Sequence, residues 1–207
     1  MTNTHTNESG RSMIEMLGVL AIIGVLSVGG IAGYSQAMSK FKVTKTTDQV
    51  QTMVTNIRTL FAGQRSYSGL SKDDGDYSTA YTMGILTDET WDKDNKKASN
   101  AYGGSILLGT PNSNHNFSIT YNGLSQDACT RLTMADWGDA SSGLVGLVVQ
   151  GTEQTSAPDI SSATDSKLTF ATAKAGADGG FPVALTDAVD ACSGTTDNES
   201  SITWVYR

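Results

Sequence analysis

One carboxylate stands at the entrance to a long uncharged segment close to the start of this 207-residue chain. Glu15 is followed by residues 16–33, which carry no charge. As an α-helix these 18 residues would measure about 27 Å, close to the hydrocarbon thickness of a lipid bilayer. A carboxylate beside such a segment is unfavourable unless it is paired or serves a function, so Glu15 is the first candidate functional residue.

The uncharged segment has the features of a membrane helix rather than those of a secretory signal peptide. It is longer than the apolar core of a signal peptide, which spans about 7–15 residues. A charge stands at its entrance, and no small-residue cleavage site follows Gly33. We therefore expect the segment to remain in the mature chain.

The helical pattern continues beyond this segment, but with only one apolar face. Apolar residues recur there at the spacing of an amphipathic helix; they are Val50, Met53, Val54, Ile57, Leu60 and Phe61. No proline falls between Arg11 and Gly63. The sequence thus predicts one continuous helix of about 50 residues, apolar all round in its first half and amphipathic in its second.

The rest of the chain carries the short alternating patterns of a small antiparallel sheet. Residues 63–104 show no period and predict a long loop. Strands are expected at 105–108, 116–121, 144–149 and 201–206. Asn122-Gly123 predicts a turn, Ser125 is a candidate N-cap of a short helix, and a second short helix is expected at 186–192. The expected fold class is α+β, with the long helix packed on the sheet.

Two cysteines, Cys129 and Cys192, allow two interpretations. An even number in an exported chain predicts one disulfide, which would close a loop of about 64 residues and contribute roughly 4 kcal/mol. The alternative is a pair of buried thiols. No Cys-x-x-Cys spacing supports a metal or redox motif.

Charge is sparse and unevenly distributed along the chain. Charged residues make up 17% of the sequence and the net charge is −7, a balance that fits an exported surface protein and argues against nucleic acid as a partner. Residues 39–65 carry a net charge of +4 and residues 66–207 a net charge of −10. This asymmetry predicts electrostatic steering between copies of the chain, with a merely solvated surface as the alternative.

The sequence contains no recognisable catalytic or metal-binding constellation. The histidines are His5 and His115, and no Gly-x-Ser-x-Gly, paired-histidine or phosphate-loop pattern occurs. Acidic residues at 73–76 and 92–96 match a calcium loop only in part. We therefore expect no enzyme, no cofactor and no metal site.

Residues 10–27 resemble the processing and assembly segment of type IV prepilins. In that family a glycine precedes the cleaved bond and a glutamate follows at the fifth mature position, which here implies cleavage between Gly10 and Arg11 and an assembly role for Glu15. Arg11 differs from the aromatic, Met or Leu residue that generally begins the mature family chain and becomes N-methylated. Residues 122–132, and the region from Cys192 to Trp204 and Tyr206, are similar to the type IVb pilins of toxin-coregulated, bundle-forming and conjugative thin pili.

The resemblance implies a pilin fold with a disulfide-bounded C-terminal region. Its parts would be a leader at 1–10, a transmembrane and assembly helix at 11–38, an amphipathic helix half at 39–62, and a globular head at 63–207. Within the head, residues 129–192 would be bounded by the disulfide.

The resemblance also implies a function as the structural subunit of a type IVb-like pilus serving adhesion, aggregation or conjugative contact. The precursor would lie in the inner membrane of a Gram-negative-type bacterium, and a prepilin peptidase would process it. The inner-membrane assembly machinery would then add it to a homopolymeric extracellular filament. The alternatives are a pseudopilin of type II secretion and a low-copy minor or tip pilin.

Cleavage would give Glu15 a possible partner. Its carboxylate, buried among apolar helices of a filament, could pair with the new α-amine of Arg11 on a neighbouring subunit. The side chain of Arg11 could compete for Glu15, and the alternative is a carboxylate solvated among lipid headgroups.

Overall fold

The computed structural model describes residues 9–70, 76–138, 141–158, 168–171, 183–193 and 199–207. The chain divides into two compact units, Met1–Phe41 and Lys42–Arg207. The first unit consists of the N-terminal part of one long helix, and the second contains the end of that helix together with all the strands.

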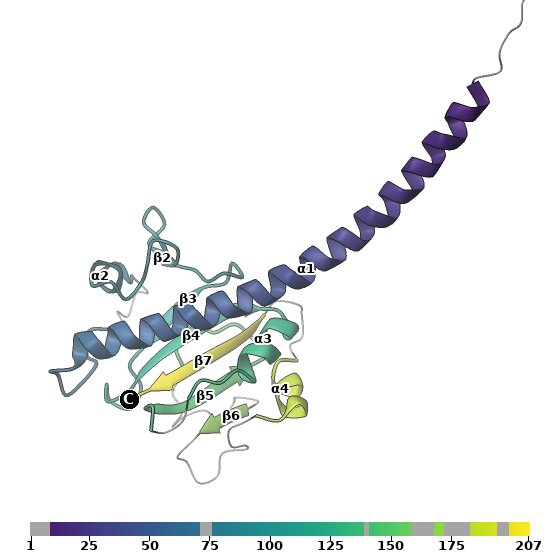
Figure 1. The fold of residues 1–207 in the computed structure, drawn as a ribbon. Coiled ribbons are helices and arrows are strands. Elements are labelled where there is room, and N and C mark those ends of the chain that lie inside the picture. Colours follow the sequence, from purple (N-terminus) through teal and green to yellow (C-terminus); the bar gives the residue numbers. More distant parts are fainter. Residues whose placement is uncertain (1–8, 71–75, 139–140, 159–167, 172–182, 194–198) are drawn as a thin grey trace, which may run out of the picture. The chain divides into compact units, whose positions relative to one another are not determined.

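Helix α1 extends over Ser9–Phe61 without a break, which confirms the prediction of one continuous helix (Figure 1). No proline interrupts its hydrogen bonds, and its residues are mostly good helix formers or membrane-type apolar residues. By length and composition, Met13–Phe61 is the one helix among the described residues that could cross a membrane.

The second unit is built around a five-stranded antiparallel sheet with the strand order β3-β4-β7-β5-β6. The strands are β3 (Ile106–Gly109), β4 (Phe117–Leu124), β5 (Leu144–Gln150), β6 (Leu168–Ala171) and β7 (Ser200–Tyr206). The four expected strands correspond to β3, β4, β5 and β7. The C-terminal strand β7 is central, and its Trp204 lies opposite Ile119 of β4 and Leu147 of β5.

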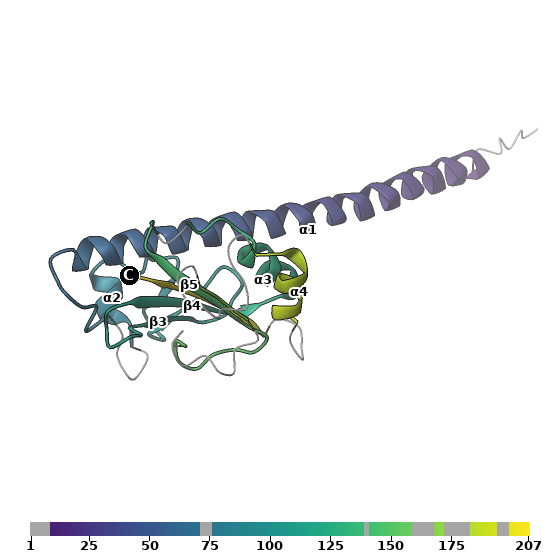
Figure 2. The same cartoon turned by 90° about the horizontal axis from the view of Figure 1, so that it is seen from below.

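The amphipathic end of α1 supplies one side of the core. Val50, Met53, Val54 and Ile57 are buried in one cluster with the side chains of β4 and β7, as the sequence pattern predicted. Figure 2 shows this end of the helix running along one face of the sheet. The last two members of the predicted stripe differ, because Leu60 is exposed and Phe61 is only partly buried.

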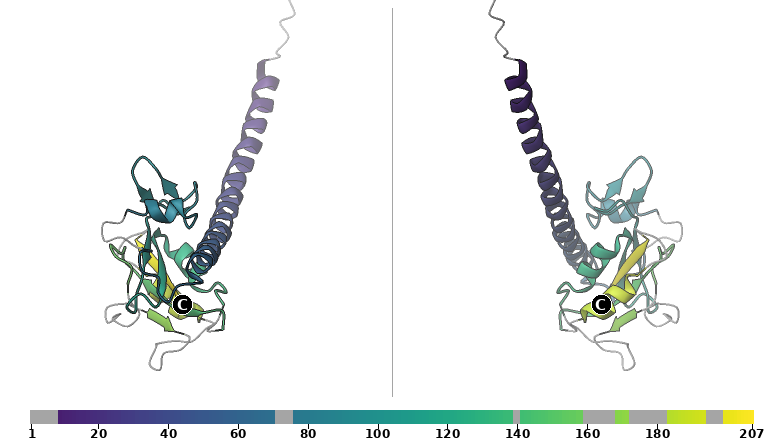
Figure 3. Two further views of the ribbon diagram at one scale, coloured as in Figure 1. Left: turned by 90° about the vertical axis from the view of Figure 1, so that its left-hand side faces the viewer. Right: turned by 90° about the vertical axis from the view of Figure 1, so that its right-hand side faces the viewer.

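The prediction of a long loop at 63–104 was wrong. Its described part contains α2 (Ser78–Thr82) and a hairpin of β1 (Trp91–Asp92) with β2 (Lys97–Ala98), which Figure 3 shows beside the sheet. Apolar side chains of this segment join the core; they are Leu70, Tyr77, Ala80, Ile85, Leu86, Trp91 and Ala98. These residues are irregularly spaced, so they produce no period that sequence analysis could detect.

The prediction of a turn at Asn122-Gly123 was also wrong, because β4 continues to Leu124. A bulge interrupts its pairing with β7 between Tyr121 and Leu124, and Gly123 adopts a φ of 71° there. Gly104 packs directly against this bulge, where a Cβ atom would overlap the carbonyl oxygen of Asn122. The left-handed φ of Gly123 therefore allows a β-bulge here and not a hairpin turn.

Two short helices lie next to each other at the end of the sheet. Helix α3 (Gln126–Thr133) begins after Ser125, whose hydroxyl accepts a hydrogen bond from the amide of Ala128 as an N-cap. Helix α4 (Leu185–Ala191) agrees with the second predicted helix to within one residue at either end. The side-chain amide of Gln126 donates to the carbonyl of Val189, which links α3 to α4.

Candidate functional site

The N-terminal part of α1 presents large apolar side chains on all sides. Between Met13 and Tyr34 these side chains are 52% to 75% exposed in the single chain. A helix at the surface of a globular protein normally buries one apolar face, whereas this segment buries none. Such a surface requires lipid or other apolar helices around it.

Glu15 is the one acidic residue on this apolar surface. Its side chain is exposed, like those of its neighbours Ile14 and Met16. No ion pair joins Glu15 to another residue in the part of the chain that the structure describes. The carboxylate is therefore placed where a group of another molecule can reach it.

The predicted cleavage site lies in the first turns of α1. Gly10 and Arg11 both have helical backbone, and the side chain of Arg11 lies outside the described part. The cleavage between them remains a prediction.

The second unit engages the basic side chains of α1 in contacts that the sequence analysis missed. Lys45 pairs with Glu89 at 3.0 Å, and the ammonium group of Lys42 lies 5.4 Å from the ring centre of Tyr102. Arg58 contacts Tyr206 at the end of β7 and Arg207 directly after it. These three cations contact residues of their own chain, and steering between copies by the net charge of residues 39–65 stays a prediction.

These contacts shift the pKa values of the acidic and phenolic partners. The hydrogen bond and charge of Lys45 lower the pKa of the Glu89 carboxyl group. Burial raises the pKa of Tyr206 to about 12, although the nearby guanidinium of Arg58 acts in the opposite direction. Burial also raises the pKa of Tyr102 to about 12. At neutral pH the acid is thus charged and the phenols are neutral, as the contacts require.

A disulfide joins Cys129 of α3 to Cys192 at the end of α4, which confirms the predicted pairing. Both cysteines are fully buried, and their Cα atoms are 5.8 Å apart. The hydroxyl of Ser200 at the start of β7 donates to the carbonyl oxygen of Cys192 at 2.9 Å. The disulfide therefore fastens both short helices to each other near the beginning of the central strand.

His115 and the acidic residues near Asp92, which were considered for enzymatic or metal chemistry, are exposed and do not form a common site. His115 is exposed, and its Nδ1 lies 3.0 Å from the carbonyl oxygen of Asn112. The carboxylate of Asp92 accepts hydrogen bonds from the backbone amides of Asp94 and Asn95, which is the arrangement of a local turn. Of the acidic stretch 73–76, residues 73–75 lie outside the described residues. Within the described part, no group of three or more His, Cys, Asp or Glu side chains is arranged to hold a metal ion.

Comparison with known proteins gives consistent matches. Residues 40–205 match the family model described as PilS N terminal. The chain is 30% identical over 146 residues to the major structural subunit of bundle-forming pilus from Escherichia coli O127:H6 (strain E2348/69 / EPEC), covering 70% of this chain and 72% of that protein. The corresponding subunit from Escherichia coli O111:H- is 30% identical over 138 residues, covering 66% and 69%.

A solved structure shows the same fold at low sequence identity. The crystal structure of TcpA, a type IV pilin from Vibrio cholerae El Tor biotype, aligns with a TM-score of 0.54 and 13% identity. It covers 80% of this chain and 99% of that chain, which confirms the expected pilin fold. The family model, the two relatives and the fold agree, and the chain belongs to the type IVb pilins, a family of structural pilus subunits and not of enzymes.

Proposed function

We propose that this chain is the major subunit of its pilus and that it polymerises through the N-terminal part of α1. The observation that carries the proposal is the apolar surface between Met13 and Tyr34, which is exposed on all sides in the single chain. In a homopolymer this surface can lie against the same surface of neighbouring copies and so be removed from water. Relatives named as major subunits align with about two thirds of the chain, which favours the major role.

Before assembly, the same helix would hold the precursor in the inner membrane. Its apolar length suits a bilayer, so transfer from lipid to a bundle of neighbouring helices would keep the apolar side chains away from water throughout. A prepilin peptidase would cleave between Gly10 and Arg11, and the assembly machinery would then deliver the mature chain to the filament at the cell surface.

Cleavage would create a partner for Glu15, which forms no ion pair among the described residues. The α-amine of Arg11 would be mostly protonated at neutral pH, because α-amino groups titrate at about 7.7–8.0. Pairing that ammonium group on one subunit with Glu15 of the next would define the axial register of the helices. Removing one partner of a buried pair typically costs about 3–5 kcal/mol, because the other charge is stranded among apolar groups.

Two other roles would use the same helix. A pseudopilin of type II secretion would form a short piston, and a minor or tip pilin would start a filament without forming its shaft. The length of the alignments with the bundle-forming subunits favours the role of the subunit that forms the filament shaft.

Deletion of the gene distinguishes these roles. For a major subunit, electron microscopy is expected to show cells without long fibres, and the wild-type gene is expected to restore them. Fibres that persist while secretion stops would indicate a pseudopilin, and a few fibres of normal thickness would indicate a minor subunit.

Intact-mass spectrometry of sheared surface fibres tests the processing step. The expected mass corresponds to a chain that begins at Arg11 and contains one disulfide. An added methyl group would appear in the same spectrum. A subunit that still carries residues 1–10 would contradict the proposed cleavage.

A further inference from the structure

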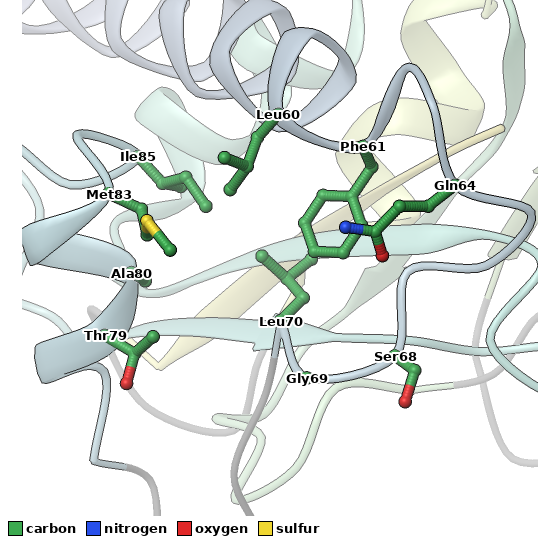
Figure 4. Close-up of a pocket in the computed structure, with 10 residues that line it drawn as sticks. All are labelled: Leu60, Phe61, Gln64, Ser68, Gly69, Leu70, Thr79, Ala80, Met83 and Ile85. Carbon is green, nitrogen blue, oxygen red and sulfur yellow. The ribbon is translucent and has the colours of Figure 1, made fainter.

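The two units differ in the form of their exposed apolar surface. In the second unit, apolar side chains line a pocket of about 210 Å³ at the C-terminal end of α1 (Figure 4). Polar side chains interrupt this lining; they are Gln64, Ser68 and Thr79. In the first unit the apolar surface is continuous along α1, so its length and composition can be compared with those of a lipid bilayer.

The uncharged part of α1 is longer than the hydrocarbon layer of a bilayer. Residues 16–39 carry no charge, and as a helix they measure about 36 Å. The hydrocarbon layer is about 30 Å thick, and a helix that is too long for it tilts. A tilted helix turns one side toward the membrane where it leaves the hydrocarbon layer, so an apolar side is required there.

The last two turns of the first unit have one apolar and one polar side. An α-helix advances about 100° per residue, which assigns each residue to a side. One side carries the apolar residues of this segment, namely Tyr34, Ala37, Met38 and Phe41. The other side carries the polar residues, namely Ser35, Gln36, Ser39 and Lys40. Residues 34–41 are therefore amphipathic, whereas the preceding part of α1 presents apolar side chains all round.

The residue types of this segment are those of a membrane–water interface. Tyr34 and Phe41 are 67% and 58% exposed, and aromatic belts of this kind lie at the level of the lipid headgroups. Lys40 is the first charged residue after Glu15 and is exposed. Its long side chain can extend to the phosphate groups of the lipids, which carry the opposite charge.

The position of the segment along α1 also suits an interface. The rise from Glu15 to Tyr34 is about 28 Å, close to the thickness of the hydrocarbon layer. With Glu15 in the headgroup layer on one side, Tyr34 enters the headgroup layer on the other. Phe41 is about 10 Å further along the helix, whereas each headgroup layer is only about 5–8 Å thick. A tilt toward the apolar side keeps Phe41 in contact with lipid.

We propose that residues 34–41 are an interfacial anchor that binds the phospholipid surface on the outer face of the inner membrane. The side with Tyr34, Ala37 and Phe41 lies in the headgroup layer, and the side with Gln36 and Lys40 faces water. This inference rests on the proposed function, because it concerns the precursor in the membrane. It adds a fixed depth and rotation of the helix before the subunit enters the filament.

Two pairs of adjacent positions test the anchor. Gln36→Cys is compared with Ala37→Cys, and Lys40→Cys with Phe41→Cys, in the full chain with its native disulfide. All four positions are exposed in the single chain, so protection of an introduced thiol would come from outside the fold. The chain is inserted into vesicles of phosphatidylethanolamine and phosphatidylglycerol, and a membrane-impermeant maleimide is added outside. Each labelling rate is divided by the rate of the same variant in SDS.

The expected order of labelling rates is the reverse of the order that depth alone would produce. Ala37→Cys and Phe41→Cys lie further along the helix than their partners, yet each is expected to react several-fold more slowly. Val25→Cys, in the uncharged segment, should stay unlabelled, and Asp48→Cys, at an exposed position beyond the anchor, should react fully. Equal rates within both pairs would overturn the anchor.

Dilution in lipid identifies the partner. Protection by neighbouring copies of the chain would fall as the ratio of lipid to protein is raised, whereas protection by lipid is expected to stay constant. Loss of the protection of Ala37→Cys on dilution would therefore overturn the lipid surface as the partner.

Replacement of the aromatic rings tests their role in the anchor. Tyr34→Ser together with Phe41→Ser is expected to make Ala37→Cys react several-fold faster, because the apolar side then loses its two rings. Phe41→Trp retains a ring suited to the interface and is expected to leave the slow reaction of Ala37→Cys unchanged. Equal rates of Ala37→Cys with and without the two rings would contradict the proposal.

The labelling pattern also separates the anchor from the proposed function. If Val25→Cys is protected while the members of each pair react alike, the helix spans the bilayer and only the anchor is wrong. If Val25→Cys reacts as fast as Asp48→Cys, the helix is outside the bilayer and the membrane stage of the proposed function itself fails.

Discussion

The guanidinium group of Arg58 donates a hydrogen bond to the carbonyl oxygen of Arg207, which lies 149 residues further along the chain, at 3.2 Å. The same guanidinium lies 5.1 Å from the ring centre of Tyr206. A side chain at Gly143, which has a φ of 82°, would collide with this group. Arg58 thus connects α1 to the end of the chain. Glycine is required at position 143, because a larger side chain there would collide with the guanidinium group.

Replacing Arg58 is expected to loosen this connection. Arg58→Leu should lower the free energy of unfolding by about 1–3 kcal/mol, because a charge-assisted hydrogen bond and a cation–π contact are lost together. Urea unfolding of the full chain in detergent measures the change. Arg65→Leu removes an exposed arginine from the loop after α1 and should change stability by less than about 0.5 kcal/mol. Equal losses in both variants would contradict a specific role for Arg58.

The buried phenol of Tyr206 makes the head sensitive to alkali. Below about pH 10 the phenol is neutral in the folded and the unfolded chain, and its contribution to stability is fully present. Between pH 10 and 12 the unfolded chain loses this proton, whereas the folded chain keeps it until its pKa of about 12 is reached. Stability is therefore lost as the pH rises through this window.

Tyr206→Phe removes this contribution and is the variant to compare. Its loss of stability between pH 9 and 12 should be smaller than that of wild type, as followed by urea midpoints in detergent. Tyr34→Phe serves as control, because Tyr34 is exposed on the N-terminal part of α1. Parallel pH profiles for wild type and Tyr206→Phe would contradict the assignment.

The disulfide between Cys129 and Cys192 spans 63 residues. Replacing both cysteines by alanine should lower the free energy of unfolding by roughly 2–5 kcal/mol, because the unfolded chain regains the freedom of a long loop. Urea unfolding with and without reductant measures this: reductant should shift the midpoint of wild type and leave that of the double variant unchanged. If reductant left the urea midpoint of wild type unchanged, the result would argue against a structural role for the disulfide.

The sequence predicted the parts of the fold that repeat regularly. The helical spacing from Val50 to Ile57 records the one face of the helix that packs into the core. The alternation in β4 and β7 records which of their side chains join that apolar core, although both faces of these two strands are buried. The segment from residue 64 to 104 has no such regularity. Its position depends on contacts over long distances, such as the hydrogen bond from the side-chain amide of Asn56 to the carbonyl of Gly84 at 2.8 Å.

The sequence gives the net charge of each segment, but it does not show which charged side chains already have partners within the chain. Net charges of +4 and −10 follow from the sequence, yet they do not reveal that Lys45 and Arg58 are already engaged within the subunit. Fewer cations of residues 39–65 are then available for a neighbour. Steering between copies by opposite charge remains a prediction, for which the test is a loss of sedimented fibre mass as salt is raised.

Glu15 is the residue on which polymerisation is expected to depend. Glu15→Gln keeps the size of the side chain and removes its charge, so a neighbouring ammonium group would be buried without a partner. A loss of about 3–5 kcal/mol per contact is expected to abolish long fibres, while the helix still holds the subunit in the membrane. Sheared fibre mass and membrane-fraction immunoblots measure the two effects separately. Ser35→Ala, on the same helix beyond the uncharged segment, is the control and should assemble normally. Normal amounts of fibre from Glu15→Gln cells would show that the carboxylate is only solvated, and the pairing with the α-amine of Arg11 would have to be abandoned.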